Sequence, residues 1–155
     1  MTDEPTAIQV RQLRLIVEAA DFDEAVAFYR DALGLPEQAA FEGSGDARVV
    51  IFEAGRATLE ISNPAQVEMI DRVEVGRPLS PKLRVAFEVD DAAAATERLR
   101  EAGAEVLGAP AETPWRSLNA RLEGPGGLQL TIFQELESLE ERRAREGFGT
   151  TGERG

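Results

Sequence analysis

One pattern of residues occurs twice along this chain of 155 residues. Arg14, between two leucines, lies seven residues before Asp21, and Arg84, between a leucine and a valine, lies seven residues before Asp91. A helical pattern follows each aspartate. Such a long internal repeat is typical of a duplicated structural unit, so the chain is expected to fold as two copies of one module.

Each copy reads as a strand, a helix and three further strands. Polar and apolar residues alternate over 10–18 and over 82–89, which predicts strands with one face toward a core. Helices are expected over 22–33 and 92–102, because each follows an aspartate cap and ends before a glycine. The later strands are expected at 37–41, 48–54 and 57–62 in the first copy and at 105–107, 117–122 and 128–133 in the second.

Two βαβββ modules are therefore predicted, at about 10–63 and 82–133. The connector, 64–81, should begin with a short helix, because Asn63 can cap it and proline suits its first position. Neither module has enough apolar surface to fold alone, so the modules should pack together as a single domain over 1–147.

The end of the chain is expected to be a charged C-terminal helix over 134–147 and a disordered tail over 148–155. The helix has two interpretations. It is either a solvated terminal helix or a segment that docks on a neighbouring subunit through Leu136, Leu139 and Phe148.

Composition excludes several kinds of function. The chain has 17 basic and 29 acidic residues and a formal net charge of −12, which argues against nucleic acid as a partner. It has no cysteine and no histidine, so thiol chemistry and the commonest metal ligand and general base are excluded. No apolar run approaches the length of a membrane span, and no export signal is evident, so a cytoplasmic location without a membrane partner is expected.

Strand alternation indicates where the chemistry lies. The helix of each module needs the apolar face of its sheet, so the polar residues turn toward the opposite face. Symmetry of the repeat would bring Arg14 and Arg84 to equivalent places on that face. The candidate residues of the polar face are Arg14, Glu60, Arg84, Asn119, Arg121 and Thr131.

Several segments resemble one family. Residues 21–35 (DFDEAVAFYRDALGL) resemble the helix signature of the vicinal oxygen chelate superfamily, which includes glyoxalases, bleomycin-resistance proteins and extradiol dioxygenases. Similar matches occur at 57–61, 85–90 and 124–127. The resemblance implies an α+β fold in which two βαβββ modules with cupped mixed sheets enclose one cavity. It also implies a homodimer, a state that the exposed edges of open sheets would favour.

In the metal-dependent members, four positions facing the cavity hold a divalent ion, and the resemblance places these on Arg14, Glu60, Arg84 and Thr131. Only Glu60 could bind a cation strongly, while two permanently protonated guanidiniums would repel one. No metal and no cofactor are therefore expected.

Three functions remain open. The first is sequestration of a small polar or anionic organic ligand without chemistry, similar to bleomycin resistance, with Trp115 either as an aromatic wall of the cavity or as packing. The second is a structural or interaction module in which Arg14, Glu60 and Arg84 form a salt-bridged plug. The third is a metal-independent lyase or isomerase with Glu60 as base, but a carboxylate beside two guanidiniums would be a poor base. Binding is therefore favoured over catalysis.

Overall fold

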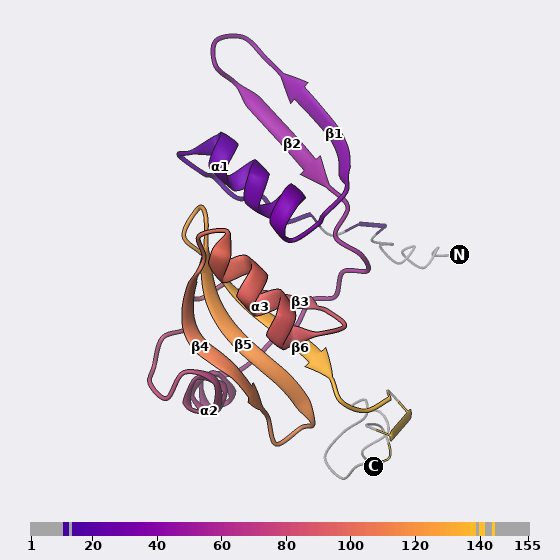
Figure 1. The fold of residues 1–155 in the computed structure, drawn as a ribbon, viewed down its shortest axis with the longest axis vertical. Coiled ribbons are helices and arrows are strands. Elements are labelled where there is room, and N and C mark those ends of the chain that lie inside the picture. Colours follow the sequence, from indigo (N-terminus) through magenta and orange to yellow (C-terminus); the bar gives the residue numbers. More distant parts are fainter. Residues whose placement is uncertain (1–10, 13, 139, 142–143, 145–155) are drawn as a thin grey trace, which may run out of the picture.

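The strands form two separate sheets in the computed structural model, which describes residues 11–12, 14–138, 140–141 and 144 (Figure 1). In the described ranges, a two-stranded antiparallel sheet stands apart from a four-stranded sheet of order β3-β6-β5-β4. β3 runs parallel to β6, whereas β6 with β5 and β5 with β4 are antiparallel. The strands are β1 (Glu37–Glu42), β2 (Arg48–Phe52), β3 (Val85–Glu88), β4 (Glu105–Glu112), β5 (Ser117–Gly124) and β6 (Leu128–Glu135).

The helices begin at the caps that the sequence predicts. α1 (Phe22–Ala27), α2 (Pro64–Glu74) and α3 (Ala92–Glu101) follow Asp21, Asn63 and Asp91. Each cap side chain accepts a hydrogen bond from a backbone N–H three residues on, at 3.1, 2.9 and 3.0 Å. These bonds satisfy N–H groups that have no partner within the helix, and so fix where each helix starts. α1 continues into a π-helical turn, η1 (Phe28–Ala32).

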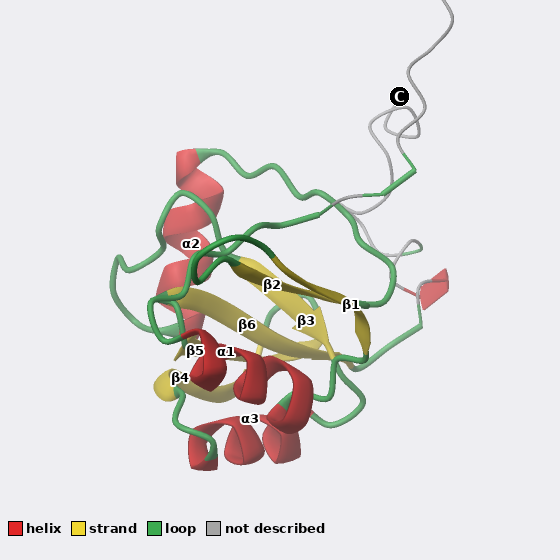
Figure 2. Cartoon of the chain, turned by 90° about the horizontal axis from the view of Figure 1, so that it is seen from above, coloured by secondary structure: helices red, strands yellow, loops and turns green. Residues whose placement is uncertain are grey.

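α2 and α3 lie on opposite sides of the four-stranded sheet (Figure 2). α3 covers the apolar face, where Leu99 packs with the buried Leu122, Leu130 and Ile132. η1 lies beside α3 and adds Phe28 to the same core. The first module's helical segment is therefore built into the core of the second module.

The predicted strands at 10–18 and 57–62 are corrected by the structure. Residues 11–12, 14–18 and 57–62 belong to neither sheet. Ile16 and Ile61 have 84% and 83% of their surface exposed, although both segments have the alternation of a half-buried strand. Alternation needs a partner strand to become a sheet, and these segments pair with none in the described residues.

Two other predictions fall largely outside the described residues. Residues 134–135 end β6, so the predicted C-terminal helix cannot begin there, and 140–141 are helical. The tail at 148–155 lies wholly outside. Nowhere in the described chain is there a helix with the length and apolar character needed to cross a membrane.

Candidate functional site

The face of the four-stranded sheet opposite α3 is polar. On β5, Ala120 and Leu122 are in the core, and Arg121 between them points to the other side, where it meets α2. On β6, Thr131 alternates in the same way between two buried core residues. The register places Thr131 beside Arg121 on one side and Ala86 on the other. This polar face is the candidate functional site.

Arg121 lies at the centre of a buried ion-pair network, with none of its side chain exposed. Its Nη2 is 2.6 Å from Glu74 Oε2, and its Nη1 is 3.1 Å from Asp71 Oδ1. Both carboxylates come from α2, one helical turn apart. Asn119 Nδ2 also donates to Glu74 Oε1, at 2.8 Å. Further bonds from Arg121 reach Ser80 Oγ and Gln129 Oε1 at 3.1 and 3.2 Å. A buried charge is stable only when paired and hydrogen-bonded, and these contacts meet that condition.

Asp71 also anchors the connector that follows α2. Its carboxylate accepts the N–H groups of Leu79 and Ser80, both at 2.9 Å, and the Ser80 hydroxyl at 2.5 Å. Burial raises the pKa of Asp71, but these bonds and the one from Arg121 outweigh it and hold the pKa at about 2. Asp71 therefore stays ionised, and it fixes the loop leading to Arg84.

Arg84 lies directly before β3, is partly buried, and donates to Thr131 Oγ1. Burial lowers the pKa of Arg84, as does the neighbouring charge of Arg121, while the carboxylates of Glu74, Glu60 and Asp71 act in the opposite direction. Within the described ranges, none of these carboxylates comes to ion-pair distance of it. A partly desolvated guanidinium without a close counter-ion is a strong binding group for a carboxylate or phosphate.

The other predicted site residues lie elsewhere. Arg14 is exposed, and its Nη2 donates to Gln12 Oε1 at 3.3 Å. Glu60 is exposed as well, and its carboxylate is near enough to act electrostatically on Arg84 without forming an ion pair with it. Trp115 is partly exposed in the turn between β4 and β5, and the bond from Leu136 N to Arg116 O places that turn beside the end of β6.

The sequence analysis missed the acidic half of the network. Asp71 and Glu74 are three residues apart on α2, a spacing that puts both side chains on one helix face. Two carboxylates on one face of a connector helix, opposite an arginine on a strand, are a signal that could have identified the contact. Their buried state depends on where α2 docks, which local pattern does not specify.

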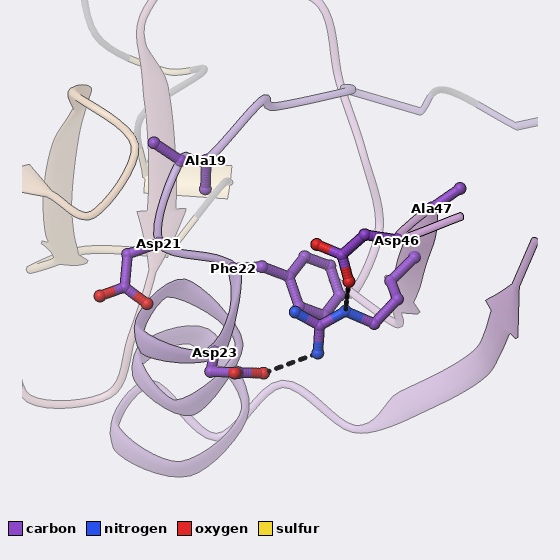
Figure 3. A pocket seen from close by; sticks show the side chains of 8 residues that line it. Ala19, Asp21, Phe22, Asp23, Asp46 and Ala47 are labelled. Carbon is purple, nitrogen blue, oxygen red and sulfur yellow. Dashed lines mark hydrogen bonds and ion pairs between the residues drawn. The ribbon is translucent and has the colours of Figure 1, made fainter. Parts of the chain in front are cut away.

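A hollow of about 720 Å³ lies away from the polar face, between the start of α1 and the β1–β2 turn (Figure 3). Here Arg48 Nη1 is 3.0 Å from Asp23 Oδ1, its Nε is 3.8 Å from Asp46 Oδ1, and its guanidinium carbon is 4.5 Å from the Phe22 ring centroid. Arg48 is thus already engaged by two carboxylates and an aromatic ring. This hollow lacks a cation available for an anionic ligand.

The residues of the polar face do not fit a divalent metal. At the four positions that hold the ion in metal-dependent relatives, Glu60 is the single carboxylate, and the Thr131 hydroxyl accepts a bond from the Arg84 guanidinium. In the part of the chain described, no three acidic side chains are grouped so that they could hold a cation. A guanidinium at the place of a ligand repels a cation.

A family model for the glyoxalase/bleomycin resistance protein/dioxygenase superfamily matches residues 11–132. The chain belongs to this superfamily, as its residues indicated, and its α+β fold is confirmed. A search of curated proteins found no match.

Several solved structures are similar to this chain. TnmS3, an antibiotic-binding protein from Streptomyces sp. CB03234, is 22% identical, with a TM-score of 0.54 over 83% of this chain and 99% of its own. A glyoxalase-related enzyme from Fulvimarina pelagi is 17% identical, with a TM-score of 0.51 over 81% and 89%. The hypothetical protein SA1046 from S. aureus is 14% identical, with a TM-score of 0.55 over 81% and 95%. At these identities the similarity establishes the fold alone.

Proposed function

We propose that this protein binds a small organic ligand with an anionic or strongly polar group and sequesters it without chemistry and without a metal. The observation that carries the proposal is Arg84, a partly buried guanidinium with a hydroxyl neighbour and no close carboxylate in the described residues. A ligand anion would supply the missing counter-charge, and such a pair gains strength away from bulk water.

The surroundings of Arg84 favour an organic ligand. Beyond Arg84 on the polar face, Ala86 of β3 is exposed and Phe133 of β6 is partly exposed. They offer apolar surface for the body of a ligand whose anionic group pairs with Arg84. The antibiotic-binding function named for TnmS3, which shares the fold, is consistent with such a role.

The remaining predicted contacts take different parts in this proposal. Asn119 and Arg121 support the wall of the site through α2 rather than touching the ligand. Arg14, Glu60 and Trp115 stay proposed contacts of the same ligand. We also propose a homodimer, because the segments 14–18 and 57–62 expose large apolar side chains such as Ile16 and Ile61. A cytoplasmic location stays a prediction of the sequence.

The test is a thermal-shift and calorimetric screen of small carboxylates, phosphates and aromatic antibiotics. Replacing Arg84→Leu should weaken binding of any hit by roughly tenfold to a hundredfold, because a charge-assisted hydrogen bond is lost. Arg84→Lys should retain part of the affinity. Arg56→Leu removes the same charge from an exposed turn and serves as the control. Hits that bind Arg84→Leu as tightly as the unaltered protein would refute the proposal.

We also predict that nickel, zinc, manganese and iron shift the melting temperature no more than a control of equal ionic strength. A ligand that binds the native state raises the melting temperature in a saturable way, so a specific metal would be detected. A stoichiometric shift that Glu60→Gln abolishes would show a metal site after all.

A structural role is the second candidate, and the buried network of Arg121, Asp71 and Glu74 favours it. Under this alternative α2 fills the polar face as a plug, and Arg84→Leu destabilises the fold without any ligand ever binding. Lyase or isomerase chemistry is the weaker alternative, because Glu60, the residue proposed as base, is exposed to water in the described structure.

A further inference from the structure

Half of the polar face is already occupied by the chain itself. α2 lies over β4 and β5, and its carboxylates take up Arg121, while the connector reaches Gln129, whose Nε2 donates to Leu79 O at 3.1 Å. The β3–β6 side, with Arg84, Ala86 and Phe133, is left uncovered or only partly covered. A ligand on this face therefore meets one arginine rather than two.

The end of α2 packs closely against the backbone of β4. A Cβ at Gly108 of β4 would come within 2.1 Å of Glu74 O, so only glycine lets the end of α2 approach the strand this closely. Val75 also lies against this point. Close backbone contact and buried ion pairs together make α2 a fixed wall of the site.

The wall also sets the local charge. Asp71, Glu74 and Arg121 together carry one net negative charge, which the positive charge of Arg84 balances. Glu88, exposed further along β3 on the same face, adds a negative charge at the far end. Lys82, two residues before Arg84, is exposed, so its charge is screened by water. One ligand anion can pair with Arg84, whereas a second anionic group would meet that screened charge and the carboxylates of α2.

We propose that α2 makes this site selective for ligands with a single negative charge. The inference rests on the proposed function, since it assigns the ligand class of that site. It predicts a monocarboxylate with an apolar body as the preferred ligand and disfavours dicarboxylates of the same shape.

The first measurement compares benzamide, benzoate and isophthalate, which differ mainly in charge, by calorimetry near pH 7.5, where both carboxylic acids are ionised. Benzoate should bind about tenfold more tightly than either of the others. Isophthalate binding as tightly as benzoate would overturn the inference and leave the proposed function standing. Failure of every anion to bind would overturn the proposed function itself.

The second measurement assigns the selectivity to α2. Glu74→Gln keeps the shape and one acceptor oxygen, replaces the other oxygen by an NH2 donor, and removes one negative charge. The preference for benzoate over isophthalate should therefore fall to about threefold or less. Glu68→Gln removes the same charge from the exposed side of the same helix, where its partner is Arg72 at 3.9 Å, and should leave the preference unchanged.

Asp71→Asn gives the same readout from the second contact if Glu74→Gln fails to fold. Equal preferences in the Glu68 variant and in either buried variant would overturn the role given to α2. A preference that falls only in the buried variants would support it.

Discussion

The two modules share one pattern of predicted elements, but they differ in how many of the predicted strands are found in a sheet. The second module has all four predicted strands in one sheet, with α3 on one face and α2 on the other. The first module has only the β1–β2 hairpin, and 57–62 and the described part of 10–18 lie outside both sheets. An alternating pattern thus specifies which face of a strand is apolar, but not whether a partner is present.

The reason lies in where the first module's helical segment packs. Phe28 is buried in the core around Leu99 and Leu122, and Tyr29 Oη donates to Pro125 O at 3.1 Å. The second sheet is therefore covered by elements from both modules. The β1–β2 hairpin receives no comparable cover, and a two-stranded hairpin alone is marginally stable.

The largest effect should come from the buried network of the second module. Arg121→Met would leave Asp71 and Glu74 buried without their cation, which should lower the free energy of unfolding by about 3–5 kcal/mol. The matched change in the first module, Arg48→Met, removes a solvent-exposed ion pair and should cost less than about 1 kcal/mol. Urea denaturation measures both, and equal costs would erase the contrast between the modules.

Apolar truncations test the same contrast next. Leu130→Ala removes a fully buried side chain from the second module and should cost about 2–5 kcal/mol in urea denaturation. Leu59→Ala, at a residue with 75% of its surface exposed, should change the unfolding of a single chain by less than about 0.5 kcal/mol.

In the proposed homodimer, Leu59 has a second consequence. Light scattering at micromolar concentration should show a dimer, and Leu59→Ala should shift it toward monomer, because Leu59 is one of the exposed large apolar residues and exposed apolar surface favours association. A monomeric mass for the unaltered protein would contradict this part of the comparison.

The smallest of the three expected effects on stability is the loss of stability at acid pH. Asp71 has a pKa of about 2, below its ordinary value of 3.8, so its contribution is complete above about pH 4 and is lost as the pH falls through 2. The depression corresponds to about 2 kcal/mol. Asp71→Asn should therefore flatten the fall in stability between pH 4 and pH 2, whereas Asp23→Asn, at an exposed carboxylate, should leave the slope unchanged. Identical profiles of stability against pH for the two variants would contradict the role given to Asp71.

Much of the fold could be predicted from local pattern. Asp21, Asn63 and Asp91 each cap a helix as expected, because a cap depends on a few neighbouring residues. The alternation on β5 and β6 also placed Arg121 and Thr131 on the face opposite the core. The register that joins Thr131 to Arg84 links residues far apart in the chain, and the sequence supplied only the expectation that both face the same side.

The sequence by itself determined the superfamily, the duplicated plan and the identity of the polar residues, since each of these depends on spacing along the chain. The tertiary structure decided which of these residues meet. It buried Arg121 under Asp71 and Glu74 and, among the described residues, left Arg84 without a carboxylate at ion-pair distance. The physical reason is that ion pairing and desolvation depend on distances between elements, and here the docking of α2 on Gly108 set those distances.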